Sequence, residues 1–156
     1  MLLDIPYIIF DQLRSELLTR KNISLAVARF DKIHPVVSGN KLFKLHYFLE
    51  SFYSGKFRSI KTFGGAYSNH LVATAFACHS LQIPCQGIVR GERPALLSPT
   101  LEQCLEYGME LSFVSRETYA ALSGDCANEA EVLVIPEGGY HPLGAAGASL
   151  IMDAIP

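Results

Sequence analysis

Four short apolar segments, with a helix-like stretch in each gap, set the strongest constraint on how this chain folds. The segments are Ser59–Phe63, Pro84–Val89, Glu110–Val114 and Glu131–Ile135, and the gaps hold Tyr67–Leu81, Pro99–Tyr107 and Arg116–Leu122. Strands and helices that alternate at this spacing require parallel strands joined by right-handed crossovers. The sequence therefore predicts an α/β fold, an open twisted and mostly parallel sheet with flanking helices.

The flanking regions are read from the same periodicities. Asp11–Leu18 could form a short helix, and Ile23–Phe30 alternates well enough for a strand. A helix is expected from Lys41 to Ser54, ended by Gly55, and a last helix over residues 143–154.

The composition of the chain limits which binding partners and which cellular compartment can be expected. The chain has 156 residues and a formal net charge of −2, which suits one domain and gives no reason to expect nucleic acid or an acidic membrane surface as a partner. No apolar run approaches the ~18 residues of a membrane helix, and residues 1–6 lack a basic leader. The four cysteines form no C-x-x-C pair, so they are expected to be reduced, mostly buried thiols of a cytoplasmic protein, and their spacing gives no support for a zinc site.

The start of the helix at Lys41 is the first candidate for chemistry. Gly39 and Asn40 suit a turn, and Asn40 is a good helix N-cap. Lys41 and Lys44 then share one face of the first turn, where the helix dipole disfavours positive charge. An amine held there loses its proton more readily, and a neutral amine can attack a carbonyl to form an imine. The alternative is two solvated lysines at a frayed helix start.

Two glycine turns that follow predicted strands are the other candidates. Gly64-Gly65 leads into Ser68, Asn69 and His70, and such a turn suits a substrate carboxylate because a helix start offers unpaired N–H groups. A plain glycine turn with Ser68 or Asn69 as a cap is the equal alternative.

At the second turn, residues 136–139, Glu137 or Tyr140 could face the same cleft, although a purely structural turn is favoured. The sequence contains no G-x-G-x-x-G, Walker or G-x-S-x-G motif.

Taken together, three segments resemble the family of 1-aminocyclopropane-1-carboxylate deaminase and D-cysteine desulfhydrase. They are His34–Leu45, Phe63–His70 and Ile135–Gly139, and the similarity runs from about Ile23 onward. The resemblance implies the fold of the tryptophan synthase β-subunit, pyridoxal 5'-phosphate as cofactor, and cleavage of a C–N or C–S bond in a small amino-acid substrate.

The resemblance also implies residue roles. Lys41 matches the lysine that binds the cofactor as an imine, and Lys44 matches a lysine near its phosphate. Asn69 matches the amide beside the cofactor's ring hydroxyl. Ser68, Asn69 and His70 match the segment that grips the substrate carboxylate, with Lys41 and Ser68 as the catalytic residues.

Two departures from the family limit these implications. Phe43 stands where many members carry an arginine, which weakens any choice of substrate. Members are also much longer, so the chain is expected to be a truncated N-terminal portion: residues 1–45 from the large domain, 46–142 the small α/β domain, and 143–156 the first helix returning to the large domain.

Because the family's phosphate-binding loop lies beyond that portion, weak or no cofactor binding by the chain alone is expected. It could form a homodimer or pair with a complementing C-terminal half. The alternatives are a non-catalytic α/β fragment, favoured by exposed apolar surface on Leu143, Leu150, Ile151 and Ile155, and a small-anion module that uses only the Gly64-Gly65 turn.

Overall fold

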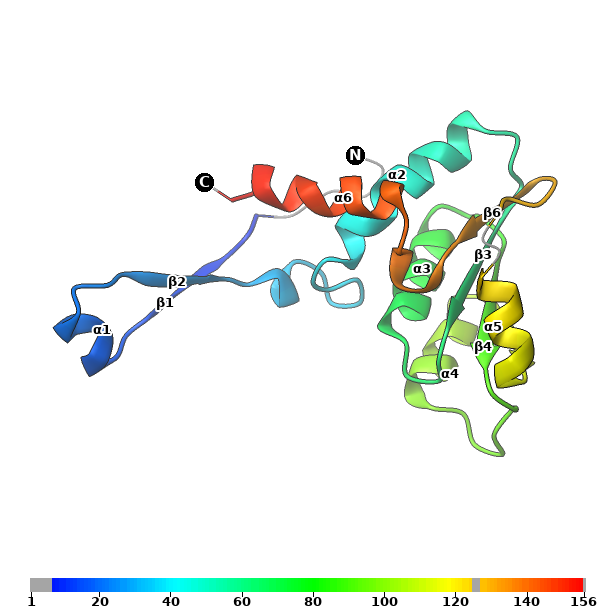
Figure 1. The fold of residues 1–156 in the computed structure, drawn as a ribbon, viewed down its shortest axis with the longest axis horizontal. Coiled ribbons are helices and arrows are strands. Elements are labelled where there is room, and N and C mark those ends of the chain that lie inside the picture. Colours follow the sequence, from blue (N-terminus) through cyan, green and yellow to red (C-terminus); the bar gives the residue numbers. More distant parts are fainter. Residues whose placement is uncertain (1–6, 125–126, 156) are drawn as a thin grey trace.

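A four-stranded parallel sheet forms the centre of the molecule (Figure 1). The structure is a computed structural model that describes residues 7–124 and 127–155. The strands are β3 (Ser59–Gly64), β4 (Cys85–Arg90), β5 (Glu110–Val114) and β6 (Val132–Ile135), in the order β5-β4-β3-β6. All three neighbouring pairs are parallel, so the predicted fold class is confirmed.

Helices cover both faces of this sheet (Figure 1). The helices are α2 (Lys41–Ser54), α3 (Asn69–Ser80), α4 (Pro99–Glu106), α5 (Arg116–Gly124) and α6 (Pro142–Asp153). On one face α3 packs so closely that a Cβ on Gly87 of β4 would lie 3.3 Å from the Leu71 side chain. On the other face Phe63, Ile88 and Val134 form a small cluster with Tyr119 of α5.

Serine caps explain where two of these helices begin. Ser68 and Ser98 are extended residues whose hydroxyl oxygens accept from the backbone N–H three residues later, which satisfies one of the unpaired donors of the helix start. Ser98 also donates to the carbonyl of Ala66 and so ties α4 to the turn after β3. The helices predicted over residues 67–81, 99–107 and 116–122 are confirmed with small shifts at their ends.

The last helix packs on α2 (Figure 1). Gly147 makes this possible, because a Cβ there would lie 2.1 Å from the Phe43 carbonyl oxygen of α2. Gly144 instead allows the close approach of the turn before α6, where a Cβ would lie 2.0 Å from the Gly139 carbonyl oxygen. Leu143, Leu150 and Ile151 are partly buried against the core, whereas Met152 and Ile155 remain exposed. The apolar side chains of α6 are therefore only partly covered within the chain, and the exposed surface expected at Ile155 is present.

The N-terminal region forms an antiparallel hairpin that projects from the rest of the molecule (Figure 1). It comprises β1 (Phe10–Leu13), α1 (Glu16–Arg20) and β2 (Leu25–Ala28), and a short 3-10 turn, η1 (Phe30–Lys32), connects it to α2. The predicted strand over residues 23–30 is confirmed. The helix predicted over Asp11–Leu18 is wrong in its first half, because residues 10–13 pair with 25–28 and α1 begins only after the Ser15 cap.

The three cysteines that the structure describes, Cys78, Cys85 and Cys104, are free and buried, as predicted; Cys126 lies outside the described residues. Across residues 7–124 and 127–155, no group of three or more His, Cys, Asp and Glu side chains could hold a metal ion. Over the same ranges, every helix is too short or too polar to span a lipid bilayer.

Candidate active site

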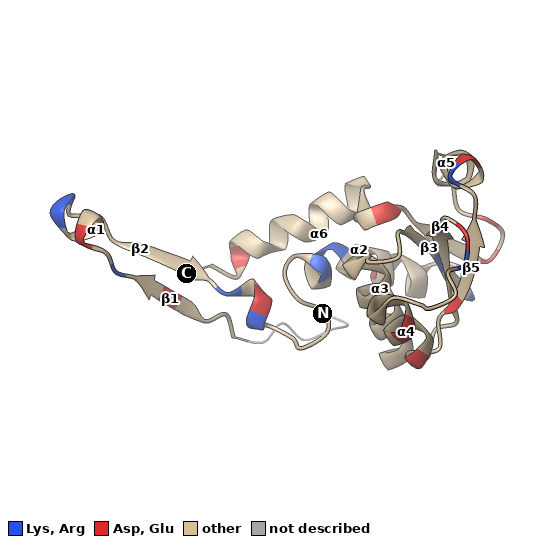
Figure 2. Cartoon of the chain, turned by 90° about the horizontal axis from the view of Figure 1, so that it is seen from below, with Lys and Arg blue, Asp and Glu red and all other residues tan. Residues whose placement is uncertain are grey.

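The candidate site is built around the start of α2, which carries two lysines, Lys41 and Lys44, and is blue in Figure 2. Lys41 is half-buried, and its Nζ donates to Oδ1 of Asn40 over 2.9 Å. Burial lowers the pKa of the Lys41 amine, and the charge of Lys44 lowers it further. The amine is therefore more readily deprotonated than a solvated lysine, which is the direction that the sequence predicted, but the causes are burial and the charge of Lys44 and not the helix dipole. The side chain of Asn40 makes no capping bond, so only its position as N-cap is confirmed.

Lys44, one turn later, connects α2 to the turn after β6. Its Nζ donates to the carbonyl oxygen of Gly138 over 3.1 Å, and its side chain packs against Gly139. Gly138 and Gly139 both have left-handed backbones, with φ of 65° and 68°. This turn (η2, Glu137–Gly139) is thus built by its two glycines.

The turn after β3 brings Ser68 to the start of α3. The Ser68 hydroxyl oxygen accepts from Leu71 N–H over 3.4 Å, so Ser68 is a cap, while its single O–H stays able to donate. Gly64 permits this arrangement, because a Cβ there would lie 2.6 Å from Ser68 Oγ. Asn69 is the first residue of α3 and is exposed.

His70 lies in the interior beside these groups, and only 3% of its surface is exposed. Its Nε2 lies 2.9 Å from Oγ1 of Thr62, which in turn donates to the carbonyl oxygen of Ile135 over 2.9 Å. Burial, together with the charges of Lys41 and Lys44, lowers the pKa of His70 to about 4. Because these two charges act on the imidazole, the lysines and the start of α3 share one electrostatic environment.

The other two candidates lie outside this group. Glu137 is exposed, and its carboxylate is 4.0 Å from the guanidinium of Arg90. Tyr140 is 91% exposed. The turn of residues 136–139 nevertheless contributes to the site, through the carbonyl of Gly138 rather than through the side chains that the sequence suggested.

Sequence reasoning missed two residues at this edge of the sheet. Thr62 carries no motif of its own, although its even spacing from Ile60 and Gly64 places it on one face of β3. Arg90, at the end of β4, lies over the ring of Tyr119 at 5.3 Å, and its guanidinium would be 3.6 Å from a Cβ on Gly65. Its position just after a predicted strand, at the carboxyl edge of a parallel sheet, is the pattern that could have found it.

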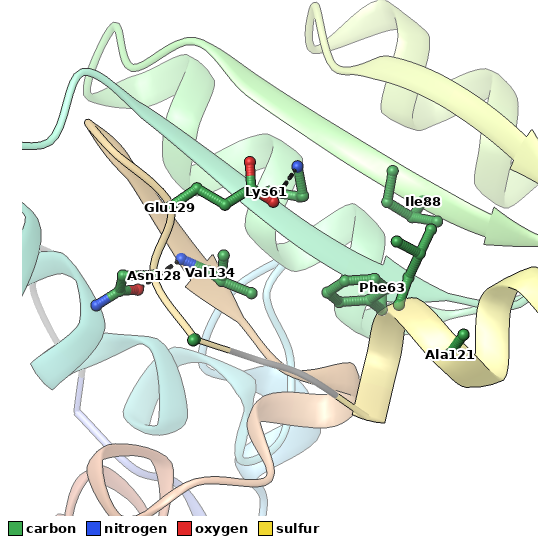
Figure 3. A pocket seen from close by; sticks show the side chains of 9 residues that line it. Lys61, Phe63, Ile88, Ala121, Asn128, Glu129 and Val134 are labelled. Carbon is green, nitrogen blue, oxygen red and sulfur yellow. Dashed lines mark hydrogen bonds and ion pairs between the residues drawn. The ribbon is translucent and has the colours of Figure 1, made fainter.

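A separate pocket of about 460 Å³ opens on the opposite face of the sheet, beside α5 (Figure 3). Its floor is Phe63, Ile88 and Val134, and at its rim Lys61 Nζ forms a 2.6 Å ion pair with Glu129. Lys61 and Thr62 are consecutive in β3 and so point to opposite faces. The pocket therefore does not belong to the site around Lys41.

Comparison with known proteins finds relatives that carry the names of the family that the sequence resembles. No protein-family model matches this chain. A protein of Thermotoga maritima assigned as a 1-aminocyclopropane-1-carboxylate deaminase is 32% identical over 145 residues, which cover 87% of this chain and 46% of that protein. The mitochondrial bifunctional D-cysteine desulfhydrase/1-aminocyclopropane-1-carboxylate deaminase of Arabidopsis thaliana is 29% identical over 139 residues, which cover 79% of this chain and 34% of that protein.

Solved structures show the same fold. An ACC deaminase homologue superposes with a TM-score of 0.74 at 23% identity, over 97% of this chain and 48% of that one. A fungal L-serine ammonia-lyase from Rhizomucor miehei gives a TM-score of 0.65 at 14% identity, over 94% of this chain and 45% of that one. The chain thus spans no more than about half the length of the relatives it matches.

The similarity in sequence to named enzymes covers most of this chain, and the fold agrees with it. The resemblance found in the sequence is therefore confirmed: over most of its length this chain is similar to part of proteins named as 1-aminocyclopropane-1-carboxylate deaminase and D-cysteine desulfhydrase, and it shares the fold of an ACC deaminase homologue.

Proposed function

We propose that this chain carries the lysine-bearing part of a pyridoxal-phosphate site, in an enzyme that cleaves a C–N or C–S bond of a small amino acid such as 1-aminocyclopropane-1-carboxylate or D-cysteine. The observation that carries the proposal is the environment of Lys41, a half-buried amine with a lowered pKa beside the start of α3. Two solved neighbours, a diaminopropionate ammonia lyase with a bound reaction intermediate and an aspartate racemase, are themselves pyridoxal-phosphate proteins.

The residues of the site fit this cofactor. An aldehyde needs a deprotonated amine, and Lys41 is the lysine whose pKa the structure lowers. A phosphate needs positive charge, which Lys44 offers, and a substrate carboxylate needs hydrogen-bond donors, which Ser68 and the backbone N–H groups at the start of α3 offer. Within the described residues, Nδ1 of His70 is buried without a hydrogen-bond partner, as expected where a ligand group completes the contacts.

When bound, pyridoxal phosphate supplies an electron sink for cleavage next to the α-carbon of an amino acid. Lys41 would hold the cofactor aldehyde through Nζ and would take and return a proton at that atom during the reaction. Ser68 would donate its O–H to the substrate carboxylate, and Asn69 would offer its amide to the cofactor ring hydroxyl. Lys44 would place its positive charge near the phosphate.

The test is to identify which lysine reacts with the cofactor. The chain is incubated with pyridoxal phosphate, reduced with borohydride, and mapped by peptide mass spectrometry. Borohydride makes even a weak, reversible adduct permanent, so the test does not require tight binding. We expect preferential labelling of Lys41, lost in Lys41→Ala.

Lys61→Ala is the matched control, because Lys61 is also partly buried but is neutralised by Glu129 on the other face of the sheet. Labelling of Lys41 should persist in this variant. Labelling spread evenly over the lysines, or concentrated on Lys61, would contradict the proposed function.

The second candidate is a non-catalytic α/β fragment, or a subunit that pairs with a second copy or a complementing C-terminal half. The exposed apolar side chains of the N-terminal hairpin favour it, and they include Leu13, Leu17, Ile23 and Leu25. The division into residues 1–45, 46–142 and 143–156 and the cytoplasmic location stay predictions. Failure of the labelling at Lys41 would favour this second candidate.

A further inference from the structure

Thr62 connects three elements through one hydroxyl group. Its Oγ1 lies 2.9 Å from the carbonyl oxygen of Ile135 in β6 and 2.9 Å from Nε2 of His70 in α3. A hydroxyl has one hydrogen, and a carbonyl oxygen can only accept. Thr62 must therefore donate its hydrogen to Ile135, which leaves its lone pairs facing His70.

The tautomer of His70 follows from this geometry. Nε2 of His70 can bond to Thr62 only by donating, so Nε2 carries the proton. A neutral imidazole has one N–H, and the other nitrogen is then an acceptor. Burial and the neighbouring charges of Lys41 and Lys44 keep the ring neutral at physiological pH, with a pKa lowered to about 4. Nδ1 is thus a buried lone pair, without a hydrogen-bond partner among the described residues.

We infer that Thr62 is a positioning residue that locks His70 in the Nε2–H form, so that His70 offers the site a hydrogen-bond acceptor and no donor. This inference rests on the proposed function and refines it. A carboxylate needs donors, so gripping it falls to Ser68 and the backbone N–H groups of the helix start. His70 instead accepts from an N–H or O–H group of the substrate or cofactor.

The unprotonated Nδ1 of His70 also discriminates between ligands. A buried acceptor left unpaired loses its interaction with water without replacement, so a ligand that brings a donor to Nδ1 is favoured over one that lacks it. A ligand that places a carboxylate oxygen against Nδ1 sets two acceptors against each other and is disfavoured.

The tautomer can be read directly by two-bond ¹H–¹⁵N correlation NMR of the imidazole rings. The chain has five histidines, so the His70 signals are assigned by their disappearance in His70→Gln. We expect His70 to show a proton on Nε2 and an unprotonated Nδ1, without titrating near neutral pH. A proton on Nδ1 in the wild-type chain would overturn the inference whatever the variants do.

Two variants test the role of Thr62. Thr62→Val keeps the shape of the side chain and removes the hydroxyl, and the single Nε2–H form should be lost. Thr62→Ser restores the hydroxyl and should restore the wild-type signals. An unchanged tautomer in a folded Thr62→Val protein would show that something other than Thr62 sets it.

The measurement is made on the chain without cofactor. A failure of the lysine labelling therefore leaves it intact, and the two proposals can fail separately.

Discussion

The packing of α6 on α2 predicts how one substitution, Gly147→Ala, changes the stability of the fold. Gly147 lies against the backbone of α2, where an added Cβ would be 2.1 Å from the Phe43 carbonyl oxygen, 3.0 Å from its carbon and 3.3 Å from the Cα of Lys44. All three atoms belong to the backbone, so no side-chain rotation can make room. Gly147→Ala must push the two helices apart.

The magnitude follows from two opposing effects. Alanine in place of glycine inside a helix is favourable by up to about 1 kcal/mol. Against this, ordinary contact begins near 3.4 Å, so the oxygen at 2.1 Å must move by roughly 1.3 Å in a packed core, and overpacking typically costs about 1–3 kcal/mol or more. We expect a net loss of about 2 kcal/mol, which for a chain of this length lowers the Tm by about 4–8 °C.

Thermal unfolding followed by circular dichroism measures this loss. Gly124→Ala in α5 is the matched control, because a Cβ at Gly124 would meet no heavy atom of the described residues within 4 Å beyond its own chain neighbours and helix backbone, and its Tm should equal or slightly exceed that of the wild type. A Gly147→Ala protein that melts at or above the wild-type temperature would refute the argument that this glycine permits the close approach of α6.

Two further predictions concern the site and its supports. The pKa of His70 is lowered from its ordinary 6.5 to about 4, so the unfolded chain binds more protons than the folded one, and the free energy of unfolding falls as the pH drops from about 6.5 to 4. The loss corresponds to about 3 kcal/mol at most. Urea unfolding at several pH values should show this loss in the wild type and much less of it in His70→Gln. Ser98→Ala removes both the cap of α4 and the bond to Ala66, and should reduce the free energy of unfolding by about 1–2 kcal/mol in urea, whereas Ser98→Thr, which keeps the hydroxyl, should lose much less.

Much of the architecture could be predicted because the relevant patterns are local. The strand at residues 110–114 and the helix at 41–54 lie where their periodicity and flanking residues predict them. Capping serines and turn glycines act within three or four residues, so their roles are readable from spacing alone. The one clear error, the helix predicted at Asp11–Leu18, arose because the pairing of residues 10–13 with 25–28 outweighed a weak helical pattern.

The sequence predicted the individual residues of the candidate site but not the hydrogen bonds that join them to distant parts of the chain. Lys41 is half-buried with a lowered pKa, in the direction that the sequence predicted but because of burial and the charge of Lys44, and the resemblance to known enzymes pointed to the same amine. That Ser68 caps α3 was one of two readings left open, and the structure shows the cap while leaving its O–H free to act. The role assigned to Asn69 stays a prediction, and the inferred tautomer of His70 argues against a grip on the carboxylate by its side chain.

The sequence alone determined the alternation of strands and helices, the positions where helices begin, and the choice of Lys41 as the candidate reactive amine. Each of these depends on neighbours only a few residues away. Only the tertiary structure decided that Lys44 binds the carbonyl of Gly138, 94 residues further along, and that Thr62 joins His70 to Ile135, 73 residues away from Thr62. Such bonds depend on where the parallel sheet brings distant backbone atoms together, and no local pattern encodes the identity of a partner so far along the chain.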